Sequence, residues 1–303
     1  MIDFRRILVP LSLTASDRTL LRYARMCIHL FEPARIDFVH VLGPAYVGAG
    51  QTGPTRQKAL VEIEHSVSDL VGPAIGPCEV RREVLTGTRL DQLLTYSAEE
   101  QTDLIVLGHK LERSGRRSLA RRLAMKAPCS MWLAPNGSPD RISKIVVPID
   151  FSNQSAEALT TAAVIAKRLE LPGCTALHVY YDQTAASFEE YDAVVRENFE
   201  TAFGSFVSRL ETQGVVFERL FLEAPSVSRA VSHLAEQGKL DLIVMGSRGQ
   251  SRSAAILLGS ESEQVISETS VPVLVVKQPG ERIGLLQVLL DREFRTRQEP
   301  RFA

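Results

Sequence analysis

The chain has 303 residues, of which 45% are hydrophobic and 23% charged, and its formal net charge is −1. This length suits two globular domains of about 150 residues each. The charge excludes a general attraction to nucleic acid or acidic membranes, and no run reaches the ~18 apolar residues of a membrane span. Four widely spaced cysteines and an N-terminus without a signal-peptide pattern predict a cytoplasmic protein with reduced, buried thiols.

The first half alternates short apolar strands with amphipathic helices. A loop rich in glycine and proline is expected at 43–54, and the Pro135-Asn-Gly-Ser-Pro139 segment is typical of a linker. The predicted elements in chain order are a strand at 6–11, a helix at 12–31, a strand at 36–42, a helix at 55–71, a strand at 79–85, a helix at 90–100, a strand at 103–108, a helix that ends at 126 and a strand at 131–133.

The same pattern begins again after the linker, at a fixed offset of 138 residues. Three strands show the repeat: Ile7-Leu-Val-Pro10 recurs from Ile145, His40-Val41 recurs as His178-Val179, and the run from Asp103 recurs from Asp241. Three matches at one offset indicate an internal duplication. We therefore predict an α/β fold with two tandem doubly wound domains, each a five-stranded parallel sheet with helices on both faces. The expected domains are 1–137 and 138–278, followed by a tail at 279–303.

A glycine-rich loop follows the apolar run of the second half that ends at Met245. It reads Gly246-Ser-Arg-Gly249, then nine residues, then Gly259-Ser-Glu-Ser262, and a helix is expected next. Glycines allow close backbone approach and positive φ, and the amides of such a loop and helix N-terminus attract phosphate. Ser260 and Ser262 add hydroxyl donors. Ligands of open parallel sheets bind where strand order reverses, which places this loop beside Asp150.

A five-stranded unit with Val147-Pro-Ile-Asp150 after its first strand and Gly-x2-Gly-x9-Gly-Ser after its fourth resembles the universal stress protein family. The resemblance extends to about Lys277 and implies an adenine-nucleotide site that holds ATP, with or without Mg²⁺. Asp150 would orient the adenine or ribose, and Val179 would offer backbone groups to the adenine. The loop would wrap the ribose and phosphates. Arg248 and Arg252 either neutralise phosphate charge or are ordinary solvated arginines of a loop. The implied binding residues are Asp150, Val179, Gly246, Arg248, Gly249, Gly259, Ser260, Glu261 and Ser262.

The first half departs from this pattern. Ser12 stands where Asp150 stands in the repeat, and Leu111 replaces Gly249. Counting back from the last strand places Arg117 opposite Gly259 and Ser118 opposite Ser260. Because arginine does not permit the close backbone approach of glycine, we predict that the first half does not bind ATP in the family manner. Its arginine-rich segment at 113–122 is read either as an anion-binding surface or as a solvated helix face.

Several residues also have a purely structural interpretation. Asp150 could cap the following helix, although Ser152 and Asn153 are better placed to do so. His40 and His178 end equivalent strands and are expected to be structural. Glu261 and Glu263 favour a helix N-terminus. We find no Walker loop, no metal-ligand spacing among the six histidines and no catalytic triad.

Three functions follow from these observations. The first is an ATP-binding stress-response regulator with one nucleotide site, in the second domain. The second is an enzyme, at most a slow ATPase or phosphotransferase, which the lack of an evident general base disfavours. The third is a nucleotide-free scaffold that binds another small molecule or a protein.

The assembly and the tail give two further expectations. The resemblance implies that the two halves pack as a pseudo-dimer through the strands at 131–133 and 273–276, leaving a chain able to form a homodimer. Apolar residues at 283, 286, 290 and 294 fall on one helical face. We expect the tail to begin with a helix, either docked on its own domain or serving as a dimerisation arm, and to end in disorder.

Overall fold

The computed structural model describes residues 3–44, 52–72, 75–109, 118–139, 141–180, 189–249 and 258–277. The first half contains β1 (Arg6–Leu11), α1 (Asp17–Phe31), β2 (Arg35–Leu42), α2 (Thr52–Leu70), β3 (Glu79–Thr86), α3 (Arg89–Glu99), β4 (Leu104–His109), α4 (Leu119–Lys126) and β5 (Ser130–Pro135). The second half repeats this order with β6 (Ile145–Pro148), α5 (Asn153–Arg168), β7 (Gly173–Tyr180), α6 (Glu189–Val207), β8 (Val216–Glu223), α7 (Val227–Glu236), β9 (Leu242–Gly246), α8 (Ser260–Glu268) and β10 (Val273–Val276).

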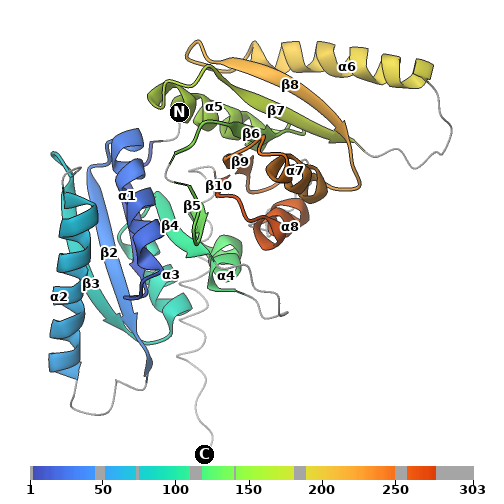
Figure 1. Ribbon diagram of the computed structural model, residues 1–303. Coiled ribbons are helices and arrows are strands. Elements are labelled where there is room, and N and C mark those ends of the chain that lie inside the picture. The colour runs from blue at the N-terminus through green and yellow to red at the C-terminus, as the bar shows by residue number, and fades with distance from the viewer. Residues whose placement is uncertain are drawn as a thin grey trace, which may run out of the picture.

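All ten strands form one sheet in the order β3-β2-β1-β4-β5-β10-β9-β6-β7-β8 (Figure 1). Strands within each half are parallel. The order reverses between β1 and β4 in the first half and between β6 and β9 in the second, so each half is doubly wound. The predicted fold class is therefore confirmed.

The sheet carries helices on both faces, and each face has its own apolar core. One core joins residues of α1, α2, α5 and α6, including Cys27, Ile63 and Phe203. The other joins residues of α3, α4, α7 and α8, including Leu123 and Val265. Because successive strand residues point to opposite faces, strands covered on both sides read as continuous apolar runs. This explains why the strands were visible in the sequence.

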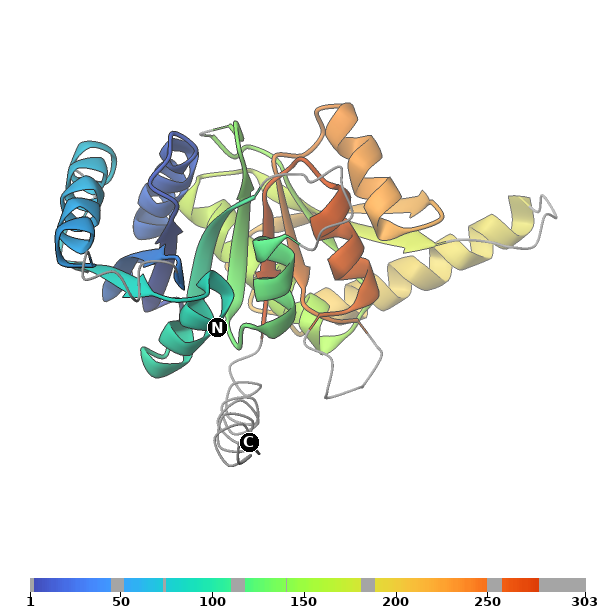
Figure 2. The same cartoon turned by 90° about the horizontal axis from the view of Figure 1, so that it is seen from below.

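The two halves meet at β5 and β10, which pair antiparallel, with Trp132 opposite Leu274. Each strand is the last of its own five-stranded half, as predicted, but lies in the middle of the combined sheet, so its backbone groups have a partner. Helices α4 and α8 lie next to each other beside this junction (Figure 2). Between them Arg121 donates from Nε to Glu263 Oε1 at 2.6 Å.

A buried lysine completes the junction. The side chain of Lys277, which is 2% exposed, donates from Nζ to the carbonyl oxygens of Ala124 and Ala127 at 2.7 Å each. Both carbonyls belong to the C-terminal end of α4, in the other half. Burial lowers the pKa of Lys277 to about 8.

The structural interpretations of the histidines and cysteines are confirmed. Nδ1 of His40 lies 3.0 Å from the carbonyl oxygen of Leu11, and Nδ1 of His178 lies 2.9 Å from that of Ile149. Each imidazole therefore ties the second strand of its half to the end of the first. All four cysteines are free and buried. The predicted tail at 279–303 and the segment at 110–117 lie outside the described residues.

One helix begins later than predicted. The expected helix at 12–31 starts at Asp17 because the chain before it forms a tight loop. The Asp17 carboxylate accepts the backbone N–H of Ser12 at 2.9 Å and of Leu13 at 2.7 Å. These amides are thus held by a side chain rather than by a helical turn.

Candidate functional site

The glycine-rich loop and Asp150 meet at the carboxyl ends of β6 and β9, where the strand order reverses. They enclose a cavity of about 280 Å³. Of the predicted binding residues, all but Val179 line it. The lining residues are Pro148, Ile149, Asp150, Ser155, Val227, Met245, Gly246, Arg248, Gly249, Gly259, Ser260, Glu261 and Ser262. The topology therefore brings together segments about 100 residues apart in the sequence.

Asp150 is held in place by the start of α5. Its Oδ1 accepts a hydrogen bond from the backbone N–H of Ser152 at 3.0 Å and another from the hydroxyl of Ser155 at 3.0 Å. Ser152, not Asp150, is the N-cap of α5, because its hydroxyl accepts the backbone N–H of Ser155. Phe151 has a φ of 63°, in the left-handed region, and turns the chain from the strand end into the helix.

Gly246 and Gly249 are required by close approach. A Cβ atom on Gly249 would lie 2.5 Å from Oδ2 of Asp150, and one on Gly246 would lie 2.7 Å from Cβ of Gln154. A Cβ on Gly259 would meet its nearest neighbour at an ordinary 3.5 Å. None of the three glycines has a positive φ, so of the two properties that favour glycine in such a loop only close approach applies here. Space, rather than backbone handedness, selects glycine at 246 and 249.

The first turn of α8 is fastened to its surroundings on two sides. The hydroxyl of Ser262 donates to the carbonyl oxygen of Gly246 at 3.0 Å, and this side chain is 3% exposed. The Ser262 hydroxyl proton is therefore used in a hydrogen bond within the protein, whereas Ser260 is exposed at the cavity rim. Oε2 of Glu261 accepts the backbone N–H of Val227 at 3.1 Å, and so joins α8 to the first residue of α7. Glu261 thus has a structural partner while it also lines the cavity.

Val179 does not line the cavity, and its side chain packs against the core of the α7 face. The carbonyl oxygen of the next residue, Tyr180, accepts from Ala224 on the β8 side. Backbone groups alternate in direction along a strand, so those of Val179 point toward β6. Because β6 ends at Pro148, they face the space above its carboxyl end. Arg252 lies outside the described residues.

Comparison with known proteins agrees with this architecture, in which the sheet is duplicated and a glycine-rich loop lies where the strand order reverses. The model of the universal stress protein family matches residues 3–135 and again 141–277. The chain belongs to the universal stress protein family. A universal stress protein of Methanocaldococcus jannaschii is 34% identical over 144 residues, which are 45% of this chain and 82% of the relative.

Two solved structures share the tandem fold. A universal stress protein from Archaeoglobus fulgidus has a TM-score of 0.64 and 19% identity, and the match covers 91% of this chain and 97% of that one. A functionally unknown protein from Pseudomonas aeruginosa has a TM-score of 0.66 and 15% identity, covering 95% and 98%. At these identities the likeness shows the fold alone.

Three residues of this universal stress protein site were missed by the motif. Ser155 orients Asp150, Gln154 packs against Gly246, and Val227 holds Glu261. Ser155 could have been found from the repeat, because the offset of 138 pairs it with Asp17 and pairs Asp150 with Ser12. The contact between Val227 and Glu261 carries no comparable signal.

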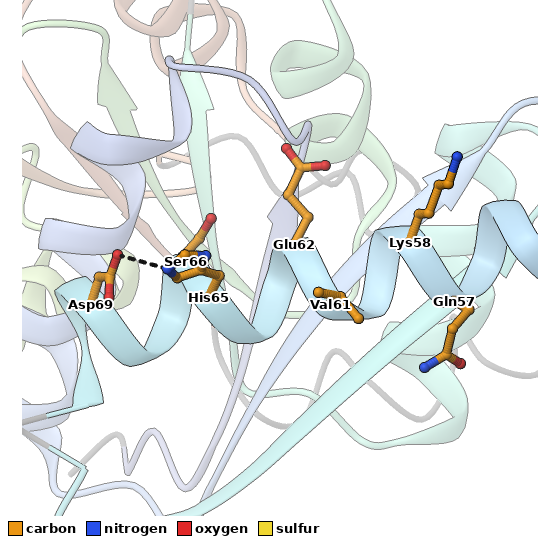
Figure 3. Close-up of a pocket in the computed structure, with 7 residues that line it drawn as sticks. All are labelled: Gln57, Lys58, Val61, Glu62, His65, Ser66 and Asp69. Carbon is orange, nitrogen blue, oxygen red and sulfur yellow. Dashed lines mark ion pairs between the residues drawn. The ribbon is translucent and has the colours of Figure 1, made fainter.

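Other features of this universal stress protein give weaker candidates. Figure 3 shows the side chains that line another pocket, all of which come from α2, with an ion pair between His65 and Asp69 at 3.8 Å. One helix alone does not bring polar groups together from several directions, as binding sites do. Within the described ranges, no three His, Cys, Asp or Glu residues are grouped to hold a metal ion. None of the helices described there is long and apolar enough to span a bilayer.

Proposed function

We propose that this universal stress protein is an ATP-binding regulator of the stress response with one nucleotide site, in the second domain. The proposal rests on the contact between Gly249 and Asp150. A Cβ at position 249 would lie 2.5 Å from Oδ2, so a larger residue there would have to displace the Asp150 carboxylate. A loop built around the carboxylate in this way is a candidate for a ligand that touches both.

The residues present suit the parts of ATP. Asp150 would accept a hydrogen bond from the ribose or adenine, and the backbone groups of Val179 would meet the adenine edge. The glycine loop and the N-terminus of α8 would surround the phosphates, with the Arg248 guanidinium beside them. The cavity of about 280 Å³ lies near the lower end of small-molecule sites. This size suits a ligand that extends out of the cavity toward Val179.

Regulation would proceed by linkage rather than by chemistry. A nucleotide that contacts the loop and α8 would change the free energy of the conformation it binds. Helix α8 also contacts the first domain through Glu263 and Arg121. In this proposal residues 1–137 and 138–278 act as an intramolecular pseudo-dimer, and ATP adjusts the surface offered to a partner or to a second copy of the chain.

The test is to denature the purified protein and examine the supernatant for adenine nucleotide, comparing the wild type with Gly259→Arg. This change introduces the arginine that stands at position 117 in the first half. Its Cβ fits, so the fold should survive while the side chain fills the cavity. Gly43→Arg is the matched control, because a Cβ there meets nothing within 4 Å.

We expect ATP with the wild type and with Gly43→Arg, and its loss with Gly259→Arg. Equal ATP in all three proteins would show that the assigned site is wrong. Steady ADP production by the wild type, absent from Gly259→Arg, would instead favour a slow ATPase at the same loop. A protein that binds no adenine nucleotide would favour the scaffold function.

A further inference from the structure

The first domain has a cavity at the position that corresponds to the proposed nucleotide site. It lies at the carboxyl ends of β1 and β4 and measures about 400 Å³, against about 280 Å³ in the second domain. Apolar side chains from three elements form part of its wall, among them Val39, Val41, Leu93 and Leu107. Polar groups, including Ser12, Arg89 and His109, complete the lining. A volume of this size is typical of small-molecule sites.

The carboxylate that lines this cavity, Asp17, stands on the helix rather than at the strand end, and its oxygens already accept hydrogen bonds from the chain. In the second domain Asp150 stands at the strand end and Ser155 on the helix, whereas in the first domain Ser12 stands at the strand end and Asp17 on the helix. The Asp17 carboxylate already accepts the hydroxyl of Ser12 at 2.7 Å, as well as the backbone amides of Ser12 and Leu13. The strand end therefore presents a neutral hydroxyl where the second domain presents an acid.

The remaining charges change in the same direction. When the two halves are aligned on their last strands, Leu119 occupies the position of Glu261. Each of the two residues lines the cavity of its own domain. Arg89, the first residue of α3, corresponds to Val227, the first residue of α7. The acids in the lining thus fall from two in the second cavity, Asp150 and Glu261, to one in the first, Asp17, and each described lining holds one arginine, Arg248 in the second and Arg89 in the first. No residue in the part of the chain that the structure describes forms an ion pair with Arg89.

We propose that the first-domain cavity binds a small molecule with an apolar body and one anionic oxygen group, a carboxylate or a phosphate ester. The apolar body packs against Val39, Leu93 and Leu107, and Arg89 holds the anion, since a guanidinium pairs with such groups through two parallel hydrogen bonds. This site is separate from the proposed ATP site and does not depend on it. The duplicated domain thereby carries two sites of different ligand class.

The experiment titrates the full chain with phenylbutyrate, with its neutral analogue phenylbutanol and with phenyl phosphate, using isothermal titration calorimetry. Arg89→Gln removes the guanidinium, and Leu119→Glu introduces the acid found at position 261. Arg122→Gln is the matched control, because it removes a positive charge from an exposed position of the same domain. Circular dichroism verifies that each variant is folded.

We expect at least one anion to bind the wild type and Arg122→Gln equally. It should bind at least about 10-fold more tightly than phenylbutanol, because only the anion can form a charge-assisted hydrogen-bond pair with the guanidinium. Arg89→Gln and Leu119→Glu should each weaken it about 10-fold or more. The tighter of the two anions identifies the preferred group. The proposal is overturned if neither anion binds at about 10 mM, if acid and alcohol bind equally, or if Arg89→Gln has no effect. Loss of binding in Gly259→Arg would also overturn it, by placing the ligand in the second domain.

Discussion

Ser155 donates its hydroxyl to the carboxylate of Asp150 at 3.0 Å, and the same pair of groups recurs in reverse order 138 residues earlier, where Ser12 donates to Asp17 at 2.7 Å. The hydrogen bond is kept while the acid moves from the helix to the strand end. Only in the second domain does the acid stand beside the glycine loop. The two halves therefore present different chemical groups at the same strand end, although their backbones follow the same path.

We predict that Ser155→Ala weakens ATP binding about 5-fold. The Ser155 hydroxyl orients the Asp150 carboxylate that would accept a hydrogen bond from ATP, and one such hydrogen bond is worth about 1 kcal/mol. The Asp150 carboxylate would keep its bond from the backbone N–H of Ser152 but lose its second donor. Calorimetric titration with ATP measures the effect. Asp17→Ala, which alters the corresponding position of the other half, should leave the ATP affinity unchanged. Unchanged affinity in Ser155→Ala would mean that this hydroxyl does not position Asp150.

The repeat and the strands could be predicted from the sequence because buried parallel strands are continuous apolar runs, as at 103–108 and 241–246. The loop motif placed Gly246, Gly249 and Asp150 together correctly. Their proximity follows from chain topology, since loops after the first and fourth strands of a doubly wound sheet always meet. These features depend on local patterns and on general rules for connecting strands.

Contacts between side chains distant in sequence could not be predicted in this way. Glu261 finds its partner at Val227, and Lys277 reaches the carbonyl oxygens of α4 in the other half. The reason for a glycine at 246 is the nearby Gln154, which no motif contains. Likewise the start of α1 depends on the hydrogen bonds that the Asp17 carboxylate accepts from the backbone N–H groups of Ser12 and Leu13. Such details require the packed structure.

Gly246→Ala should destabilise the fold by about 1–3 kcal/mol, the usual cost of overpacking. The new methyl group would lie 2.7 Å from Cβ of Gln154 and 3.0 Å from its backbone, so α5 or β9 would have to shift. Gly259→Ala is the matched comparison, and its methyl group at 3.5 Å should change stability by less than about 0.5 kcal/mol. Urea denaturation followed by circular dichroism gives both values. Equal stability of the two variants would contradict the close packing at Gly246.

The ion pair between Arg121 and Glu263 should stabilise the junction of the two halves. The two side chains are 33% and 27% exposed, so solvent screens part of the attraction and we expect a coupling energy of about 1 kcal/mol. Arg121→Glu would place two carboxylates together and lower the unfolding midpoint, and adding Glu263→Arg should restore most of the loss. A double-mutant cycle with alanine variants measures the coupling. A restored charge pair that recovers no stability would show that the junction does not depend on it.

Lys277 should make stability increase with pH in the alkaline range. Burial lowers its pKa in the folded protein to about 8 from an ordinary 10.5, despite two carbonyl acceptors that favour the charged form. Between these values the unfolded chain holds a proton that the folded chain has released, so the free energy of unfolding rises with pH, by at most about 1.4 kcal/mol per pH unit. The urea unfolding midpoints of the wild type and Lys277→Met are measured at several pH values between 8 and 10. The difference between the two midpoints isolates the contribution of Lys277, because all other groups titrate in both proteins. We expect the wild type to gain stability relative to Lys277→Met as pH rises. A difference between the two proteins that stays constant with pH would show that Lys277 remains charged in the folded state.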